Sequence, residues 1–430
     1  MNLIMSLNCG TSSAKYALYD MENGTPICKG VVERVTVGGS VIRHEVYGEG
    51  EYKTAHECAD HTEAIRLIFD TISGKVAPEF GVVDELSRIK AVGHRVVHGG
   101  HRFVKSALVT GDVYDAIVEM IDFGPLHNPA NLAGIDACRK LLPSVPQVAV
   151  FDTAFFQTLP PKAYLYGCAK EWYDKYRVRK YGFHGSSHLY LSRRAAVMLS
   201  KKPRQTNLVT LHIGNGISLT AVKNGEAVDH SMGLSPLEGV MMGTRSGDVD
   251  PAIIPFICRK ENLDAGEVVN TWLNRKSGVF GFTGITDIRD LCAKVDQGDE
   301  ASRTAYELYC YKIKKYLGSY LCVLDYDIDA VVFAGGVGEN GWNVRRDILH
   351  GFEKVGIVLH PEKNRQAVGT KGECVISSDD SEIGIFVIPT NEEQVLLEDV
   401  IAILEDRYDD HTRFSYSFDS SDWRQDNPVN

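Results

Sequence analysis

The sequence lacks several patterns that would define its chemistry directly. Its ten cysteines include no C-x-x-C pair, which predicts reduced thiols rather than a disulfide framework or a zinc site. No G-x-x-x-x-G-K-[ST] motif is present, so a P-loop nucleotide site is excluded. No apolar run is long enough to cross a membrane, and the start MNLIMSLN has no basic region of the signal-peptide kind. These absences predict a cytoplasmic protein.

An excess of positive charge is also missing. The 430 residues include 46 Lys and Arg against 57 Asp and Glu, a net charge of −11. This balance argues against nucleic acid or an anionic membrane as a partner. If the ligands are anions, positive charge must be gathered locally. The chain is long for a single core, so two domains are expected.

What is present begins with the stretch Leu3–Asp20. An apolar run of strand length leads into Asn8-Cys9-Gly10, which has turn chemistry. Three hydroxyl residues, Thr11 to Ser13, follow the turn, and Lys15 adds a positive charge. Glycine lets the backbone approach a ligand, and hydroxyls and N–H groups at a tight turn donate to phosphate oxygens. The stretch is either a phosphate-binding hairpin or an ordinary surface hairpin.

A second, similar unit lies about half a chain away. Leu208–Gly225 has an apolar strand, a turn at 213–216 and a return strand. Both units close with Asn-Gly, at Asn23-Gly24 and Asn224-Gly225, which is a strong hairpin signal. The repeat predicts an α/β chain of two related domains, each presenting a hairpin to one ligand. This arrangement resembles the actin-like ATPase (ribonuclease H-like) fold, which implies a nucleotide cleft between the domains.

Apolar periodicity places the main elements and the domain limits. It predicts helices over 62–74, 112–120, 130–141, 189–199 and 300–324, and strands over 89–97, 147–151, 330–334 and 382–389. A terminal helix is expected over 390–405. The first domain is assigned to 1–152, completed by that helix, and the second to 153–389. Residues 406–430 have few aliphatic side chains, so this tail is predicted to be disordered.

Two arginines lie beside glycines or a strand end. Arg95 follows Gly93-His94 in a predicted strand, and Arg245 lies within Gly243-Thr244-Arg245-Ser246-Gly247. A guanidinium in such a place can bind phosphate or carboxylate through two parallel hydrogen bonds. Each arginine could equally be a structural partner of a carboxylate.

Four further polar residues have both a chemical and a structural interpretation. His184, between glycine and aromatic residues, is a catalytic candidate or a satisfied core histidine. Asp152 follows a predicted strand and could act in the site or cap a helix. Asn8 could bind a ligand or stabilise its own turn. Glu392 could bind a cation or be an acid of the first helical turn.

A glycine motif near the end of the second domain admits another alternative. Gly336 to Gly341 matches G-x-G-x-x-G after a strand, the fingerprint of a dinucleotide fold. The motif occurs late in the chain, and the two hairpins do not belong to a Rossmann unit. A glycine turn beside adenosine or an α-phosphate is the preferred interpretation.

Taken together, eight segments in this order resemble the acetate kinase family. The resemblance covers residues 1 to about 404. The segments are Asn8–Lys15, Gly93–Gly100, Pro125–Pro129, Phe151–Phe155, Tyr181–His188, His212–Gly216, Met242–Asp250 and Thr390–Glu393.

The resemblance implies reversible phosphoryl transfer between ATP and acetate, giving acetyl phosphate and ADP. It implies catalytic roles for Asp152, Arg95, His184 and Arg245. It places the substrate pocket at Arg95, Val97, Leu126, Phe183 and Pro236. Nucleotide contacts would fall on Thr11, Ser13, Lys15, His212, Ile213, Gly214, Asn215, Gly216, Asp287, Ile288, Arg289, Gly336, Val337, Gly338, Glu339 and Asn340. Asn8 and Glu392 would bind Mg²⁺, with Mn²⁺ as an alternative ion, and the family's homodimers form through the second domain.

The sequence departs from the family pattern at a few positions. Phe156 stands where histidine is frequent, which removes a polar group near Asp152. Ile288 replaces a residue that is commonly aromatic, so the adenine base is expected to be bound less tightly. Two alternatives stay open: a propionate or butyrate kinase of the same family, and a non-catalytic actin-like ATP-binding protein.

Overall fold

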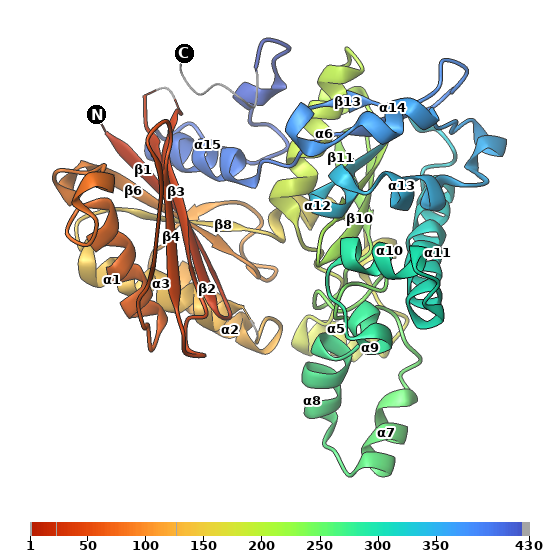
Figure 1. The fold of residues 1–430 in the computed structure, drawn as a ribbon, viewed down its shortest axis with the longest axis horizontal. Coiled ribbons are helices and arrows are strands. Elements are labelled where there is room, and N and C mark those ends of the chain that lie inside the picture. The colour runs from red at the N-terminus through yellow and green to blue at the C-terminus, as the bar shows by residue number, and fades with distance from the viewer. Residues whose placement is uncertain (1, 23, 126, 424–430) are drawn as a thin grey trace. The chain divides into compact units, whose positions relative to one another are not determined.

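The computed structural model describes residues 2–22, 24–125 and 127–423. The chain forms two compact units (Figure 1). Unit 1 comprises Met1–Phe155 and Asn391–Asn430, and unit 2 comprises Phe156–Thr390. The boundaries expected from the sequence, at 152 and 390, fall close to these. Among the described residues, no helix combines the length and the apolar character that a membrane crossing needs.

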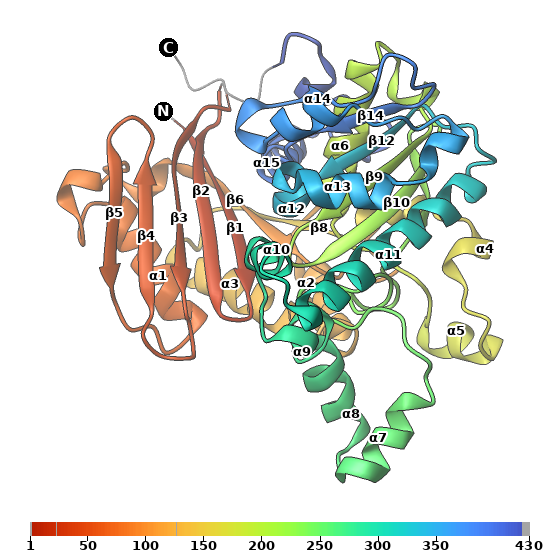
Figure 2. The ribbon, with the colours of Figure 1, turned by 45° about the vertical axis from the view of Figure 1, so that its right-hand side comes forward.

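Unit 1 contains a mixed eight-stranded sheet in the order β5-β4-β3-β2-β1-β6-β8-β7. Figure 2 shows β5 to β1 side by side in this order. β1 pairs antiparallel with β2 and parallel with β6, which in turn pairs parallel with β8. The strands are β1 Leu3–Gly10, β2 Ser13–Asp20, β3 Pro26–Glu33, β4 Val41–Val46, β5 Gly50–Ala55, β6 Ile89–Val96, β7 Ala107–Leu108 and β8 Gln147–Phe151.

Side-chain alternation along β1 divides the core of unit 1 into two layers. Leu3 and Met5 pack in a cluster that also takes the apolar faces of α1 and α3. Ile4 points to the other face and packs against Leu396 and Val400 of α15. This period of two is what a strand covered on both faces requires. The helices of unit 1 are α1 His61–Ile72, α2 Gly111–Glu119, α3 Asn128–Leu141 and α15 Glu392–Leu404.

Most helix starts lie within two residues of the sequence expectation, but α6 begins at Gly185, four residues before the expected 189. The cap explains one of the small differences. Thr62 was expected to begin the first helix, but Asp60 is its N-cap and accepts from the backbone N–H of Glu63 at 2.9 Å. A carboxylate at this position satisfies a free N–H and interacts favourably with the helix dipole.

The segment after Glu405 contradicts the expectation of a disordered tail as far as residue 423. Phe414, Tyr416 and Phe418 are 9%, 3% and 0% exposed, and their rings contact one another in sequence. Tyr416 also donates to the carboxylate of Asp399 on α15 at 2.9 Å. Aromatic side chains therefore anchor this segment to unit 1 without any aliphatic residues.

Unit 2 repeats the strand pattern of unit 1. Its six-stranded sheet has the order β11-β10-β9-β12-β14-β13. The antiparallel hairpin β9–β10 is continued by the parallel strands β12 and β14, as β1–β2 is continued by β6 and β8. The strands are β9 Leu208–Ile213, β10 Ile217–Lys223, β11 Glu226–His230, β12 Ala330–Ala334, β13 Cys374–Val375 and β14 Gly384–Val387.

The helices of unit 2 cover its sheet, and those within residues 253–283 form a helical extension. α6 and α11 both pack on β9, and Figure 2 shows α11 running along this sheet. The helices are α4 Pro161–Tyr164, α5 Lys170–Tyr176, α6 Gly185–Met198, α7 Ile253–Glu261, α8 Ala265–Glu267, α9 Gly278–Thr283, α10 Ile288–Asp296, α11 Glu300–Val323, α12 Gly335–Asn340, α13 Trp342–Leu349 and α14 Pro361–Gln366.

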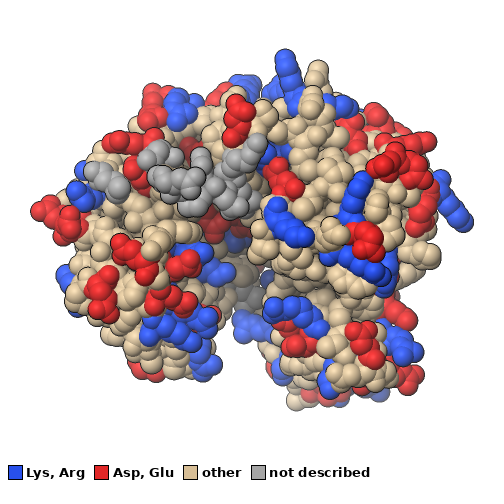
Figure 3. Space-filling view, turned by 45° about the horizontal axis from the view of Figure 1, so that its top comes forward, with Lys and Arg blue, Asp and Glu red and all other residues tan. Residues whose placement is uncertain are grey.

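Acidic and basic side chains are interspersed on the face shown in Figure 3. Many form exposed pairs within one helix, such as Lys170 with Asp174 at 2.7 Å. Exposed pairs of this kind contribute about 0–1 kcal/mol each. We therefore expect the charged side chains that bind a ligand to lie at the ends of the buried strands.

Candidate functional site

In unit 1, the carboxyl ends of two neighbouring parallel strands bring Arg95 and Asp152 together. Arg95 lies near the end of β6, and Asp152 follows β8 directly. Nε and Nη2 of Arg95 donate to the two carboxylate oxygens of Asp152 at 2.9 and 2.8 Å. This two-pronged pair is the strong form of the interaction. Two separate candidates from the sequence thus form one ion pair, in which Asp152 is only 2% exposed.

Glu392, the first residue of α15, joins this pair. Its Oε2 lies 3.3 Å from Nη1 of Arg95. Burial by itself lowers the pKa of Arg95, but the negative charges of Asp152 and Glu392 outweigh it and the net pKa is raised. Burial, followed by the charge of Glu392, raises the pKa of Glu393. The carboxylates outnumber the guanidinium here, which favours a cation close by.

The β1–β2 hairpin carries the predicted phosphate-binding hydroxyls of unit 1. Asn8 lies on β1 opposite Lys15 of β2. Thr11 is exposed at the turn, and Ser13 is half-buried. His61 of α1 holds the turn, because its Nε2 is 2.8 Å from the carbonyl oxygen of Gly10. The Asn-Gly that was expected to close this unit includes Asn23, which lies outside the described residues.

Asn131 of α3 is a residue that the sequence analysis did not single out. It is 2% exposed. Its Nδ2 donates to the carbonyl of Cys9 at 2.9 Å, and its Oδ1 accepts from the N–H of Val97 at 3.1 Å. It therefore ties the end of β1 to the residue after β6, the predicted pocket residue Val97. An asparagine on the apolar face of a helix was the available signal. Leu126, another predicted pocket residue, lies outside the described residues.

In unit 2, His184 occupies a strained position at the start of α6. Its φ is 61°, which is the left-handed region and costs energy for a residue with a side chain. Its Nδ1 lies 2.8 Å from Oγ of Ser218 on β10, and its ring packs at a tilt of 32° against His212 of β9 with a centroid distance of 4.4 Å. The ring is thus fixed by contacts on both strands of the second hairpin.

Arg245 and His184 converge over Gly216, the last residue of the β9–β10 turn. A Cβ at Gly216 would lie 3.4 Å from Nη1 of Arg245 and 3.6 Å from Nε2 of His184. These two nitrogens are therefore at most 7.0 Å apart, the sum of 3.4 and 3.6 Å. Glycine leaves open the space at which both side chains are aimed. Separate sequence candidates are again brought together by the fold.

The charge of Arg245 has no carboxylate partner among the described residues. Its Nη1 donates to the carbonyl of Pro236 at 3.2 Å, and its own carbonyl accepts from the N–H of Met242 at 3.0 Å. Burial lowers the pKa of Arg245. A half-buried cation held only by neutral groups is less favourable than one that an anion completes. This makes Arg245 a position for an anionic group.

The predicted nucleotide residues of unit 2 gather at one edge of its sheet. β9 ends at Ile213 and the neighbouring parallel strand β12 ends at Ala334. A Cβ at Gly335, whose φ is +75°, would lie 2.8 Å from the carbonyl carbon of Ile213, so only glycine fits there. The residues that follow form the helix α12, where the sequence predicted a glycine turn. Ligands of open α/β sheets bind at this carboxyl edge.

Glu339 of α12 fixes the strand ends to each other. Its Oε1 accepts from the N–H of Gly335 at 3.0 Å and of Thr390 at 3.2 Å. Burial raises its pKa. The hydrogen-bond network extends from Thr390 to Ser187 and His212, because Ser187 Oγ lies 2.8 Å from both Thr390 Oγ1 and His212 Nδ1. The predicted residues Glu339 and His212 thus serve the scaffold of this edge.

The predicted adenine-binding residues lie at the start of α10. Asp287 is the N-cap, and its Oδ1 accepts from the N–H of Arg289 at 2.8 Å. The Arg289 side chain folds back onto the same carboxylate at 2.5 Å. Ile288 is 7% exposed. The two charged residues pair with each other at the surface, while Ile288 belongs to the core.

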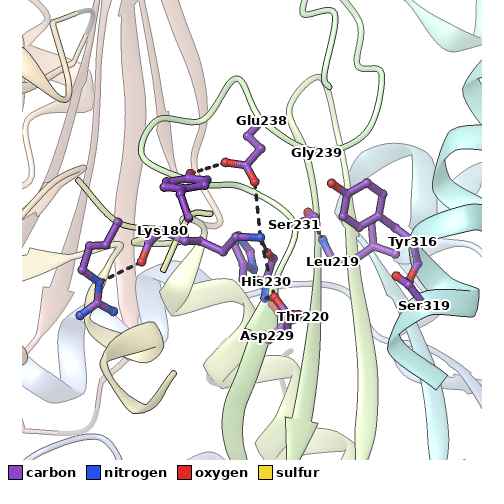
Figure 4. Close-up of polar contacts among 12 residues, drawn as sticks. Lys180, Leu219, Thr220, Asp229, His230, Ser231, Glu238, Gly239, Tyr316 and Ser319 are labelled. Atoms are coloured by element: carbon purple, nitrogen blue, oxygen red, sulfur yellow. Dashed lines mark hydrogen bonds and ion pairs between the residues drawn. The ribbon is translucent and has the colours of Figure 1, made fainter. Parts of the chain in front are cut away.

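A polar cluster braces the loop that carries Pro236 (Figure 4). Nζ of Lys180 donates to the carbonyl of His230 at 2.8 Å and lies 3.5 Å from Glu238. The hydroxyl of Tyr166 donates to Glu238 and accepts from the N–H of Leu234 at 2.8 Å. These contacts attach the loop of residues 233–238 to Lys180 and Tyr166.

Phe183 and Phe156 lie behind this loop in the core of unit 2. Phe183 is 1% exposed, and its N–H donates to Nε2 of His230 at 3.1 Å. The ring of Phe156 packs on His230 with a centroid distance of 4.0 Å. A Cβ at Gly182 would lie 2.5 Å from that ring. Phe156 therefore packs against His230 and Gly182, in addition to its place in the sequence near Asp152.

Known proteins resemble this chain over nearly its whole length. A model of the Acetokinase family matches residues 3–398. An acetate kinase of Geobacter metallireducens is 52% identical over 422 residues, which is 98% of this chain and 99% of that protein. An acetate kinase of Treponema pallidum is 47% identical over 417 residues, 97% of this chain and 92% of that protein.

Solved structures agree in fold. An acetate kinase of Porphyromonas gingivalis superimposes with a TM-score of 0.86 at 40% identity, covering 94% of this chain and 100% of that chain. A propionate kinase of Francisella tularensis gives a TM-score of 0.85 at 36% identity, covering 93% and 99%. The α/β fold of two related units, expected from the two hairpins, is confirmed. The chain belongs to the Acetokinase family.

Proposed function

We propose that this protein is an acetate kinase, which transfers the γ-phosphoryl group of ATP to acetate and runs reversibly from acetyl phosphate and ADP. The observation that carries the proposal is the convergence of Arg245 and His184 over Gly216, in a chain related to acetate kinases along its length. The reaction creates a mixed anhydride without a covalent enzyme intermediate being required, so positioning and electrostatics do most of the work.

Arg245 and His184 act on the transferring phosphoryl group. In the transition state, negative charge spreads over the three equatorial oxygens of that group. The guanidinium of Arg245, half-buried and without a carboxylate partner in the described chain, stabilises this charge. His184 donates a second hydrogen bond through Nε2, since its Nδ1 is engaged with Ser218. Preorganised donors of this kind are each worth about 10²–10³ in rate.

Arg95, Asp152 and Glu392 serve the acceptor and the metal. Arg95 binds the carboxylate of acetate, and Asp152 orients the guanidinium through its paired hydrogen bonds. Asn8 and Glu392 offer an amide oxygen and a carboxylate, oxygen ligands that suit Mg²⁺, or Mn²⁺ in its place, together with phosphate and water. Within the described ranges no three His, Cys, Asp or Glu side chains form a metal cage, and Mg²⁺ needs none. Bound there, the ion neutralises charge on the nucleotide phosphates.

The nucleotide binds at the carboxyl edge of the unit 2 sheet. The turn at 213–216 and α12 supply backbone N–H groups for phosphates, and a helix start favours an anion. Thr11, Ser13 and Lys15 of the first hairpin add hydroxyls and one positive charge. Ile288 is aliphatic and only 7% exposed, so it offers the adenine little contact and base discrimination is expected to be modest.

Acid choice rests on Val97, Phe183 and Pro236. Acetate presents one methyl group, which a small apolar wall can recognise. A methylene in such a pocket is worth about 1–3 kcal/mol, so propionate should be used more weakly and butyrate poorly. The test is acyl phosphate formation from ATP with Mg²⁺ and each acid, trapped as the hydroxamate. A higher kcat/KM for propionate or butyrate than for acetate would overturn the acetate assignment.

The Val97→Ala variant sharpens this test. Removing two methyl groups should lower the KM for propionate relative to that for acetate. Val109→Ala, a substitution of an aliphatic side chain packed in the core beside Phe151, serves as the control for general loosening. An unchanged ratio in Val97→Ala would exclude Val97 from the pocket.

The protein acts as a homodimer in the cytoplasm. Unit 2 exposes large apolar side chains in its helical extension, among them Phe256, Trp272 and Phe282 at 50%, 42% and 51% exposure. Covering such side chains favours association of unit 2 with a second copy. All ten cysteines are unpaired, as expected in a reducing compartment. Sedimentation analysis measures the oligomeric state directly, and a monomer at micromolar concentration would contradict the dimer.

A further inference from the structure

A chain of hydrogen bonds leads from His184 into the core of unit 2. Nδ1 of His184 lies 2.8 Å from Oγ of Ser218 on β10. The same Oγ lies 2.8 Å from Nε2 of His188 on α6. Nδ1 of His188 lies 2.7 Å from Oγ1 of Thr210 on β9. Three elements thus contribute to one continuous line of donors and acceptors.

Beyond His184, the chain is sealed from solvent. Ser218, His188 and Thr210 are each 0% exposed. Burial, reinforced by the charge of His212, holds the pKa of His188 well below its usual range. His188 is therefore neutral, with one ring nitrogen donating and the other accepting. Each hydroxyl also has a single proton, so the direction of one hydrogen bond dictates the direction of the next.

Only two orders of donors are consistent with this geometry. In the first, His184 Nδ1 donates to Ser218, Ser218 donates to His188 Nε2, and His188 Nδ1 donates to Thr210. In the second, every bond is reversed, and Nδ1 of His184 accepts from Ser218. The first order suits a cationic His184 or a neutral His184 with its proton on Nδ1, and the second suits a neutral His184 with its proton on Nε2. In the cation and in the neutral form of the second order, Nε2 is a donor and no buried nitrogen loses its partner.

We propose that Ser218 and His188 are positioning residues that allow Nε2 of His184 to remain a hydrogen-bond donor when His184 is neutral as well as when it is cationic, because the buried chain that ends at Thr210 can reverse its direction. The inference rests on the proposed function, in which Nε2 faces the transferring phosphoryl group. It assigns a role to a serine and a histidine that do not themselves touch a substrate.

The other titratable groups around His184 do not replace this chain. The His212 ring packs at a tilt against His184, and its Nδ1 is directed to Ser187. Arg245 approaches from across Gly216. His230 lies 5.3 Å from His188 between ring centroids, but its Nε2 accepts from the N–H of Phe183, which commits its Nδ1 to Thr220. Within unit 2, the Nδ1 atom of His184 therefore depends on Ser218.

The test compares Ser218→Ala with Thr220→Val in the full-length protein. Thr220 lies on the same strand, is also 0% exposed, and pairs with a histidine, His230, at 2.8 Å. Ser218→Ala is expected to lower kcat roughly 10- to 100-fold, the effect of one hydrogen bond to a charged group, with the KM values for ATP and acetate little changed. The acid limb of the kcat–pH profile should shift in Ser218→Ala and stay in place in Thr220→Val.

A second readout is independent of turnover. In protein labelled at the histidine ring nitrogens, the His184 signals, assigned with His184→Gln, should change in Ser218→Ala but not in Thr220→Val. Ser218→Cys, with a weaker donor and acceptor of similar size, should give intermediate values of kcat. Should Ser218→Ala fail to fold, Thr210→Val tests the far end of the chain, with a smaller change in the same direction.

The results separate this inference from the proposed function. Unchanged His184 signals and kcat in folded Ser218→Ala overturn the inference, and so does an equal effect in Thr220→Val. A loss of activity in His184→Gln combined with a silent Ser218→Ala overturns the inference alone. Wild-type kcat in His184→Gln overturns the proposed role of His184, whereas the ring signals still report whether Ser218 directs its proton.

Discussion

At the scale of single residues, the two site arginines differ in their partners: Arg95 has carboxylates and Arg245 has neutral groups. Arg95 is held by Asp152 and Glu392, and its pKa is raised by their charges despite burial. Arg245 is held by a backbone carbonyl, and burial lowers its pKa. The same substitution should therefore affect stability differently at the two positions, although both side chains are expected to matter for turnover.

Arg245→Leu should lower kcat by about 10²–10³, because a donor to the developing phosphoryl charge is lost. It should not lower the melting temperature, since it removes a buried charge that has no carboxylate partner among the described residues. Activity assays and calorimetry on the same preparation check both parts. A melting temperature several degrees below wild type would show that Arg245 is structurally required.

Arg95→Leu should lower both kcat and stability. It leaves the carboxylates of Asp152 and Glu392 without their cation, and breaking a buried pair costs about 3–5 kcal/mol. The double variant Arg95→Leu/Asp152→Asn removes one of the stranded charges, so it should recover part of the melting temperature but none of the turnover. Recovery of turnover in the double variant would argue against substrate binding by Arg95.

The sequence predicted these residues individually but not their partners. Arg95 and Asp152 lie 57 positions apart, and only the parallel pairing of β6 with β8 makes them neighbours. Ser218 gave no signal, because a single serine in a strand is unremarkable until its contacts are known, and the only signal of Asn131 was an asparagine on the apolar face of a helix. Glycine, in contrast, was informative: Gly216 and Gly335 occupy places where a Cβ would meet another part of the site.

At the scale of elements, buried strands were predicted closely and chain ends poorly. The strands 147–151 and 330–334 have the predicted bounds, because continuous apolar runs mark them. The strand expected over 382–389 is shorter, Gly384–Val387. The tail was misjudged because aliphatic content was used as the criterion. The alternation Phe414-Ser415-Tyr416-Ser417-Phe418, with aromatic residues buried and serines exposed, was the signal for packing.

Truncation after Glu405 should therefore destabilise unit 1. It removes the buried rings of Phe414, Tyr416 and Phe418, each worth about 1.5–3 kcal/mol when fully buried. The melting temperature should fall by about 5 °C or more, at ~2–4 °C per kcal/mol. Phe418→Ala should reproduce part of the loss, and Ser415→Ala, at an exposed position of the same segment, should not. An unchanged melting temperature after truncation would mean that the segment does not hold α15.

The contact between this segment and α15 should respond to pH. Asp399 is 3% exposed and accepts from Ser106 at 2.6 Å and from Tyr416 at 2.9 Å. Burial raises its pKa to about 7, whereas an unfolded aspartate titrates near ~3.9. Between about pH 4 and pH 7 the folded state thus holds a proton that the unfolded state has released, so stability falls as pH rises through this window.

Asp399→Asn should reduce the dependence of stability on pH in this window, whether it raises or lowers stability at any single pH. Asp406→Asn, at an exposed position just after α15, provides the matched control and should keep that dependence. The measurement is the melting temperature of all three proteins at intervals between about pH 4 and pH 7. The same slope in Asp399→Asn as in wild type would assign the pH dependence to other groups.

At the scale of the whole molecule, the proposed site residues are divided between the two units. Unit 2 carries His184, Arg245 and the predicted nucleotide edge within one continuous segment, 156–390. Unit 1 carries Arg95, Asp152 and Glu392. The fragment 156–390 should fold, because its sheet is complete, and should bind ADP in equilibrium dialysis without forming acyl phosphate. Acyl phosphate formation by the fragment would show that the unit 1 residues are dispensable.

The discontinuity of unit 1 also has a consequence for biosynthesis. One face of its sheet, with Ile4 and Val148, is covered by α15, which is translated only after all of unit 2. At ~5–20 residues per second, synthesis of 156–390 leaves that apolar face uncovered for roughly 10–50 s. Unit 2 can therefore fold on the ribosome before unit 1 is complete, although the synthesis of unit 1 begins first. Nascent chains of this protein should therefore aggregate, or recruit a chaperone, through the face that awaits α15.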